Sequence, residues 1–192
     1  MKKIAVVTGT RAEYGLLKPL IKALHNDSSI KLQLLVTAMH LSREYGMTVN
    51  EIINDGFPIS RKIECLLNSD SAMGVSKSIA FALSSFAEAF EKERPDIVVV
   101  LGDRTEMLAV TIASNMANIP IAHIHGGETT EGAYDEGIRH AISKMSYWHF
   151  TSSADYQKRV IQLGESPERV FNVGAIGLDS IKNIKLLSKK DL

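Results

Sequence analysis

The sequence has 192 residues, which is enough for one domain with a substantial core and marginal for two. Charged residues make up 23% of the chain and balance to a formal net charge of zero, which argues against non-specific attraction to nucleic acid or anionic lipid. The single Cys65 excludes a disulfide within one chain, and no apolar run approaches the roughly 18 residues of a membrane helix. We therefore expect a cytoplasmic globular protein that binds neither membrane nor nucleic acid.

Short apolar runs alternate along the chain with segments in which apolar residues recur every three to four positions. The runs predict strands and the periodic segments predict helices. In the first half of the chain we expect strands at 3–8, 32–39 and 59–66, and helices at 12–26, 42–55 and 73–93. The last of these helices should end before Pro95 and contribute Phe81, Phe86 and Phe90 to the core.

The second half repeats the alternation. We expect strands at 96–102, 119–126, 147–153 and 170–176, helices at 105–118, 135–146 and 153–164, and core positions at Met116, Ile138, Ala141, Ile142 and Met145. Repeated strand–helix units with apolar strands predict the α/β class, with a doubly wound parallel sheet that is Rossmann-like. The charged tail at 181–192 resembles the start of a linker, so we expect the domain to span residues 1–180.

Polar residues follow the first strand in the stretch VTGTRAEYG. Gly9 permits a tight turn, and Arg11 lies at the start of a helix whose free amides favour an anion such as phosphate. Neither a G-x-G-x-x-G fingerprint nor a phosphate-binding Gly-Lys-Ser/Thr is present. A structural turn with a surface arginine is an equally good interpretation.

Asp103 and Arg104 follow the strand at 96–102. One interpretation is an ion pair at the start of the next helix. The other is functional, because an acid directly after a buried strand is partly desolvated and its pKa is therefore easily shifted.

The segment HIHGGE contains His123, His125 and Glu128. Alternation along a strand places the two histidines on one side, where with Glu128 they form a possible metal site, although hydrogen-bonded histidines are the commoner case. Gly126 and Gly127 leave room for a ligand to approach the backbone.

Asp135 and Glu136 begin the next predicted helix, and Arg139 and His140 lie one turn later. Capping acids with an Asp135–Arg139 pair are the structural interpretation. The functional one is a set of acids that face the ligand crevice, which in open parallel sheets lies beyond the carboxyl ends of the strands.

Several ordered motifs together resemble the hydrolysing UDP-N-acetylglucosamine 2-epimerases of bacterial sialic acid synthesis. These are TGTRAEYG, TAMHL followed by YGMTV, LGDRTEMLAV, HIHGGETTEGAYDEGIRHAISKMS, and RVIQLGE followed by VFNVGA. The resemblance covers essentially the whole chain. Ala12 stands where non-hydrolysing relatives typically have proline, which favours the hydrolysing branch.

The resemblance implies the N-terminal half of a two-domain fold like that of the GT-B glycosyltransferases. It implies conversion of UDP-N-acetylglucosamine and water to N-acetylmannosamine and UDP through 2-acetamidoglucal, with no cofactor and no metal. It also implies a homo-oligomer, and a chain that alone turns over its substrate poorly. The expected catalytic residues are Asp103, Glu128, Asp135 and His125, and the expected substrate-binding residues are Gly9, Arg11, His40, Arg104, Gly127, Glu136 and Arg139.

One position departs from the family pattern. Many relatives have a catalytic glutamate where His125 stands, so either His125 or Glu128 is expected to take over its proton transfer. Two other functions stay open. One is the same reaction on a UDP-2,4-diacetamido-trideoxyhexose of the legionaminic acid pathway, and the other is a non-catalytic domain that binds nucleotide sugars.

Overall fold

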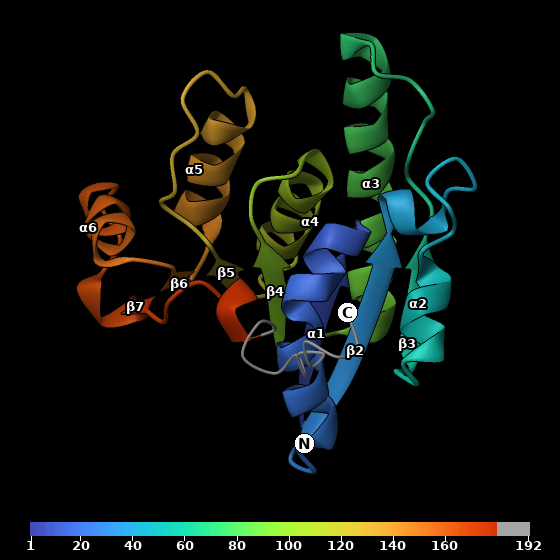
Figure 1. Ribbon diagram of the computed structural model, residues 1–192, viewed down its shortest axis with the longest axis horizontal. Helices are drawn as coiled ribbons and strands as arrows, with labels where there is room; N and C mark the ends of the chain where they lie inside the picture. Colours follow the sequence, from blue (N-terminus) through green and yellow to red (C-terminus); the bar gives the residue numbers. More distant parts are fainter. Residues whose placement is uncertain (180–192) are drawn as a thin grey trace, which may run out of the picture.

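The computed structural model describes residues 1–179, whose strands form one seven-stranded parallel sheet in the order β3-β2-β1-β4-β5-β6-β7 (Figure 1). The strands are β1 (Lys2–Thr8), β2 (Ile30–Thr37), β3 (Ile59–Ile63), β4 (Ile97–Leu101), β5 (Ile121–Ile124), β6 (Trp148–Thr151) and β7 (Val170–Asn172). The predicted α/β class and doubly wound parallel sheet are confirmed. The expected linker at 181–192 lies outside the described residues.

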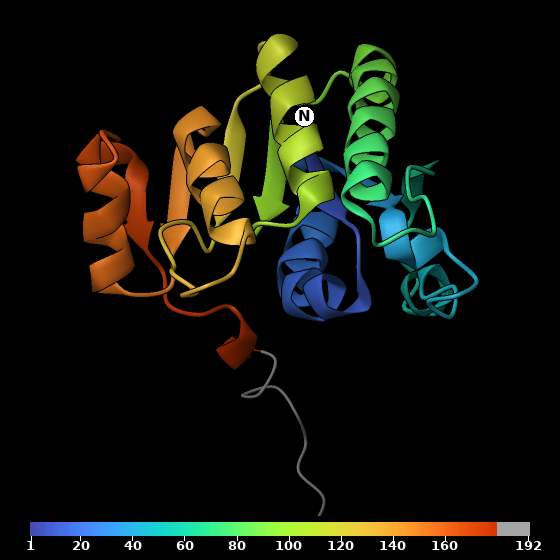
Figure 2. The same ribbon diagram turned by 90° about the horizontal axis from the view of Figure 1, so that it is seen from above.

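Helices cover both faces of the sheet (Figure 2). They are α1 (Arg11–Asn26), α2 (Val49–Asn54), α3 (Ala72–Glu93), α4 (Thr105–Met116), α5 (Asp135–Met145) and α6 (Ala154–Gln162), with short 3-10 turns η1 (Ala38–Leu41) and η2 (Pro167–Arg169). Helices α1 and α2 pack on one face, α3 to α5 pack on the other, and α6 lies beside β6 and β7. Among the described helices, none is long and apolar enough to cross a membrane.

The strand order reverses between β1 and β4. The chain winds outward from β1 to β3, crosses back along α3, and then continues outward from β4 to β7. Such a reversal opens a crevice at the carboxyl ends of the two central strands, where ligands of doubly wound sheets bind. The turns after Thr8 and Leu101 therefore meet at this point.

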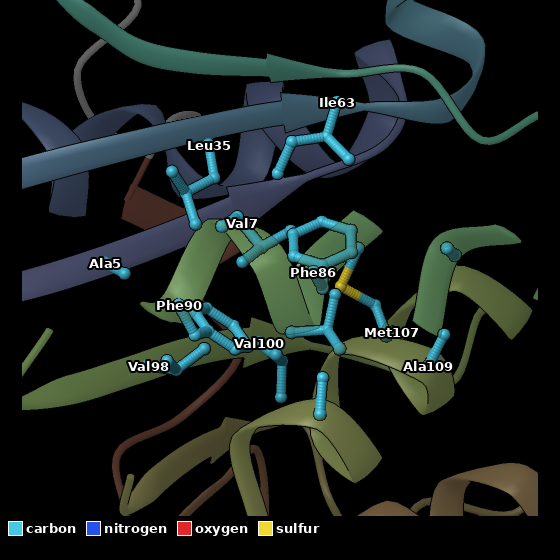
Figure 3. Close-up of a cluster of buried hydrophobic side chains, with 14 of the residues drawn as sticks. Ala5, Val7, Leu35, Ile63, Phe86, Phe90, Val98, Val100, Met107 and Ala109 are labelled. Carbon is cyan, nitrogen blue, oxygen red and sulfur yellow. The ribbon is translucent and has the colours of Figure 1, made fainter. Parts of the chain in front are cut away.

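The larger core cluster lies between the sheet and α3 to α5. Phe86 and Phe90 are fully buried there against Val7, Val98 and Val100 (Figure 3). The two phenylalanines are four residues apart and so share one face of α3. This packing holds α3 on the sheet and thereby fixes the crossover that creates the strand-order reversal.

Two predictions about the core are wrong. Phe81 is 53% exposed and Met116 is 72% exposed. Phe81 precedes Phe86 by five residues, a spacing that turns it away from the buried face of α3, and Met116 is the last residue of α4. Of the four core positions predicted in α5, Ile142 is fully buried and the others are partly buried.

The predicted helix at 42–55 is also wrong in its first half. Gly46 and Met47 both have positive φ angles, so the chain turns there, and only α2 (Val49–Asn54) is helical. The amphipathic pattern of this stretch gives no signal for the left-handed backbone that breaks it.

The start of α1 is closed by its own residues. Thr10 caps the helix through the amide of Glu13, and the Glu13 carboxylate accepts hydrogen bonds from the amides of Gly9 at 2.8 Å and Thr10 at 3.1 Å. Burial, with a contribution from the neighbouring Glu106, raises the pKa of Glu13 to about 7. The turn after β1 is therefore held by a buried carboxyl group that titrates near neutral pH.

The face of the sheet that carries α1 is covered only in part. Beyond α1, an apolar groove of about 720 Å³ runs over β4 to β7 and is lined by side chains that include Val99, Ile124, Trp148, Phe150 and Phe171. It lies on the face opposite α3 to α5.

Replacement of Phe86 by alanine should lower the free energy of unfolding by about 3–5 kcal/mol, because it leaves a cavity under α3. Urea denaturation of the chain measures this loss. The matched control is Phe81→Ala on the same helix, which should cost less than about 1 kcal/mol because the side chain is half exposed. Equal losses for the two variants would contradict this description of α3.

Glu13 should make the folded state less stable as the pH rises from about 4.5 to about 7. Its pKa is 4.5 in the unfolded chain and about 7 in the folded state, so the folded state binds the proton more tightly over that range. Glu13→Gln should remove this slope, and the stability difference between wild type and variant should change by about 3 kcal/mol. Denaturation at several pH values tests this, with the exposed Glu91→Gln as control. Parallel curves for wild type and Glu13→Gln would refute it.

Candidate active site

Asp103 and Arg139 form a buried ion pair at the carboxyl edge of the sheet. Asp103 follows β4 and Gly102, and Arg139 comes from the second turn of α5. Arg139 Nη2 donates to Asp103 Oδ2, and their side chains are only 9% and 15% exposed. A buried charge needs such a partner, so the pair fixes α5 relative to the end of β4.

The protonation of Asp103 reflects this environment. Burial raises the pKa of its carboxyl group above the ordinary value, the Arg139 charge opposes the rise, and the neighbouring Asp135 adds to it. Asp103, Asp135 and Arg139 are thus close enough to influence one another. A carboxylate with a raised pKa is a stronger base than an exposed one and suits proton transfer.

Part of this cluster lacks hydrogen bonds within the protein. Asp135 Oδ1 and the Nε and Nη1 atoms of Arg139 are buried, and none of them has a hydrogen-bond partner among residues 1–179. Buried polar atoms are nearly always paired in proteins. These atoms are therefore one acceptor and two donor atoms whose hydrogen-bonding capacity is not used within residues 1–179.

His125 and Glu128 are in contact. His125 Nδ1 lies 3.4 Å from Glu128 Oε1, and Ser152 Oγ donates to the same oxygen at 2.5 Å. The amide of Ile176 donates to His125 Nε2 at 3.4 Å, which places the imidazole proton on Nδ1, facing Glu128. Burial lowers the pKa of His125, while Glu128 acts to raise it and Arg139 to lower it.

The backbone of His125 is in the left-handed region, with φ of 64°. This conformation is rare for residues other than glycine and stores strain, which often occurs at functional sites. The Arg139 charge acts on His125 as well as on Asp103. The two candidates for the missing family glutamate are thus in contact with each other, and the Arg139 charge links His125 to the Asp103 cluster.

The turn after β1 is arranged differently from the predicted anion site. The amides of Gly9 and Thr10 bind Glu13, so they are not free for phosphate. The Arg11 side chain is 74% exposed and pairs with Glu51 of α2 at 2.8 Å. Gly9 also lies against Glu106, because a Cβ atom there would come within 2.5 Å of Glu106 Oε1.

His40 and Arg104 also have partners within the protein. His40 is fully buried between Thr8 and Thr48, with Nε2 3.1 Å from Thr8 Oγ1 and Nδ1 2.7 Å from Thr48 Oγ1, and burial lowers its pKa to about 4. Arg104 Nε donates to Glu106 Oε1 at 2.7 Å. Its guanidinium therefore lies on the β1 side of the strand-order reversal.

The two remaining predicted residues make local contacts. Gly127 has φ of 79°, and a Cβ atom there would lie 2.5 Å from the Tyr156 carbonyl oxygen, so α6 occupies the space that the sequence suggested for a ligand. Glu136 Oε1 lies 3.6 Å from His140 Nε2, one turn later in α5. Neither residue joins the Asp103 cluster through these contacts.

Sequence reasoning missed several polar residues here. Glu13 had a readable signal, since Thr10-x-x-Glu13 is a capping box. The side chains of Glu106, Ser143 and Ser152 had none, because their partners come from distant parts of the chain. Within residues 1–179 no three histidine, cysteine, aspartate or glutamate side chains are grouped to hold a metal ion.

Comparison with known proteins gives consistent matches. The family model described as UDP-N-acetylglucosamine 2-epimerase matches residues 22–192. The chain is 48% identical over 191 residues to a GDP/UDP-N,N'-diacetylbacillosamine 2-epimerase (hydrolyzing) of Campylobacter jejuni, covering 100% of this chain and 50% of that protein. It is 46% identical over 192 residues to the polysialic acid biosynthesis protein P7 of Escherichia coli, covering 100% of this chain and 49% of that protein. The chain spans about half the length of the curated relatives it matches.

Solved structures of the same family also match the fold of this chain. The crystal structure of UDP-GlcNAc 2-epimerase from Neisseria meningitidis bound to UDP-GlcNAc superposes with a TM-score of 0.82 at 24% identity, covering 95% of this chain and 48% of that one. The chain therefore has the Rossmann-like fold of one half of these GT-B-type epimerases. Together with the family match over most of its length, this shows that the chain belongs to the UDP-N-acetylglucosamine 2-epimerase family.

Proposed function

We propose that the protein acts as a hydrolysing 2-epimerase, which converts UDP-N-acetylglucosamine and water to N-acetylmannosamine and UDP in sialic acid biosynthesis. The observation that carries the proposal is the buried Asp103–Arg139 pair with Asp135 beside it, at the carboxyl edge of the sheet. Its family membership and its 46% identity to a polysialic acid biosynthesis protein support the same reaction.

In the first half of the proposed reaction, a base removes the proton from C2 of the sugar. The bond between C1 and the diphosphate oxygen breaks, UDP leaves with the electron pair, and 2-acetamidoglucal forms. We assign the base to Asp103, because burial raises the pKa of its carboxyl group and Arg139 holds it in place. Asp135, with its unpaired Oδ1, is assigned to the reacting end of the same sugar.

In the second half, water adds its hydroxyl to C1 and a proton is delivered to C2. Inversion requires that this proton arrive on the face opposite to the one it left, so a second proton-transfer group is needed. We assign this role to His125 and Glu128 together, because His125 Nδ1 lies 3.4 Å from Glu128 Oε1. This proposal joins the two alternatives that the sequence left open.

The leaving diphosphate needs positive charge nearby. Arg11 is the exposed cation at the start of α1, and to bind phosphate it has to exchange its contact with Glu51. We also propose a group of substrate-binding residues that act by shaping the site through the side chains they contact. These are Gly9, His40, Arg104, Gly127 and Glu136. The proposal also includes a homo-oligomer that works in the cytoplasm.

A second substrate has specific support. The Campylobacter relative at 48% identity is named for N,N'-diacetylbacillosamine, which is a 2,4-diacetamido-trideoxyhexose. The same acids suit both substrates, because the C2 proton, the acetamido group and the UDP leaving group are common to both. UDP-N,N'-diacetylbacillosamine is therefore the alternative substrate.

Asp103→Asn should lower kcat by about 10²- to 10⁴-fold and change KM less than about threefold, because it removes a base and keeps the shape of the side chain. The protein at its full natural length is assayed for UDP release. Asp155→Asn on α6, where the side chain is 85% exposed, is the matched control and should keep full activity. A fully active Asp103→Asn variant would rule out the assignment of the base.

Turnover in deuterated water tests the elimination route. Product NMR should find deuterium at C2 of the released N-acetylmannosamine, because that hydrogen comes from solvent when the glycal is protonated. UDP release without this label would indicate simple hydrolysis and contradict the proposal.

The ratio of kcat/KM for UDP-N-acetylglucosamine and UDP-N,N'-diacetylbacillosamine identifies the substrate.

A further inference from the structure

His123 lies in the middle of the sheet with no exposure to solvent. It is on β5, paired in register with Val100 of β4 and His149 of β6. Its Nε2 is 2.7 Å from the carbonyl oxygen of Gly102, and its Nδ1 is 3.1 Å from Ser143 Oγ. The imidazole therefore contacts the β4 end on one side and α5 on the other.

These two contacts span the same elements as the Asp103–Arg139 pair. Gly102 directly precedes Asp103, and Ser143 follows Arg139 by four residues, so it lies on the same face of α5. The His123 bridge and the ion pair are thus two parallel connections between β4 and α5. Only the ion pair contains groups assigned to the reaction.

The direction of the hydrogen bonds can be derived. A carbonyl oxygen only accepts, so Nε2 carries the proton and donates to Gly102, and Nδ1 accepts from the Ser143 hydroxyl. Burial lowers the pKa of His123 to about 3, with His149, Arg139 and His125 adding to the effect, so the imidazole is neutral at physiological pH. A neutral imidazole in one tautomer makes both bonds without placing a charge in the core.

The neighbouring glycines fit this bridge. A Cβ atom at Gly126 would lie 2.9 Å from Ser143 Oγ and 3.0 Å from His123 Nδ1, so a larger residue there would press on the bond. Gly102 has φ of 73°, and its amide donates to the Ile124 carbonyl at 3.0 Å. Strand β5 therefore holds the Gly102 residue through both its amide and its carbonyl group.

We infer that His123 is a positioning residue, whose two hydrogen bonds fix the Gly102–Asp103 turn against α5 so that the Asp103 carboxylate meets Arg139 at a set distance and angle. The inference rests on the proposed function, because it concerns the base of that reaction. A histidine that merely fills the core predicts equal effects for any replacement of similar size. A positioning histidine predicts different effects for replacements that keep different nitrogen atoms.

Two variants separate these cases. Glutamine can place its amide nitrogen near the position of Nε2 and keep the bond to Gly102, whereas asparagine reaches only the position of Nδ1. In the protein at its full natural length, His123→Asn should lower kcat about 10- to 100-fold with KM within about twofold. It should also move the acidic limb of the kcat/KM profile to higher pH, because Asp103 loses part of its contact with Arg139. His123→Gln should stay within about fivefold of wild-type kcat.

The matched control is His149→Asn. His149 is fully buried at the same register on the next strand, but its Nε2 faces Glu165 at 3.3 Å and not the Asp103 turn. This control should lower the unfolding midpoint and leave the acidic limb in place. Equal kcat and equal pH profiles for His123→Asn and His123→Gln, or an acidic limb that moves in His149→Asn as well, would overturn the positioning role.

NMR of the 192-residue chain gives a readout that does not depend on turnover. Histidine nitrogen spectra should show His123 with a proton on Nε2, none on Nδ1, and no titration between pH 5 and 8. The Asp103 carboxyl should titrate at a higher pH in His123→Asn than in wild type. If the wild type processes neither UDP-sugar, the proposed function fails, and the Asp103 titration still decides the role of His123. A proton on Nδ1 or an unchanged Asp103 titration would overturn it.

Discussion

The arrangement of the candidate site depends on a buried pair of opposite charges between two elements that the chain order keeps apart. Asp103 and Arg139 are 36 residues apart in sequence, and their side chains lie almost out of solvent. Removing either partner leaves an unpaired charge in a medium of low polarity, which costs several kcal/mol. The ion pair therefore holds the loop at the end of β4 and the start of α5 in one position relative to each other.

The turns that follow β1 and β4, at the strand-order reversal, differ in how their polar groups are paired. After β1, the amides that could bind an anion donate to the Glu13 carboxylate, and Arg104 pairs with Glu106 on the same side. After β4, buried atoms of Asp135 and Arg139 have no hydrogen-bond partner in the described part of the chain. The buried polar atoms without a partner thus include a group on the β4–α5 side, at the proposed base. Helix α1 contributes an exposed cation at its first residue, Arg11.

Local patterns predicted the strands well, because residues 97–101 of the predicted strand 96–102 are all apolar and β4 occupies Ile97–Leu101. They failed at 42–55, where a left-handed turn at Gly46 and Met47 interrupts an amphipathic segment. In the site, the strand-end rule indicated Asp103, and helical spacing placed Asp135 near Arg139. The partners of Arg11 and Gly127 were not predictable, since they depend on how α2 and α6 pack against distant turns.

The proposed reaction sets a requirement that the Asp103 environment meets. The C–H group at C2, the carbon that bears the acetamido nitrogen, is a very weak acid, so a carboxylate of ordinary pKa is a poor base for it. Burial and Asp135 raise the pKa of Asp103, while Arg139 limits the rise and keeps the carboxylate available in its charged form. The three residues must hold this balance at fixed distances, because the Coulomb energy of a charge pair changes steeply over short separations in a poorly solvated site. A neutral, fully buried imidazole between Gly102 and Ser143 fixes those distances without adding a further charge to the balance.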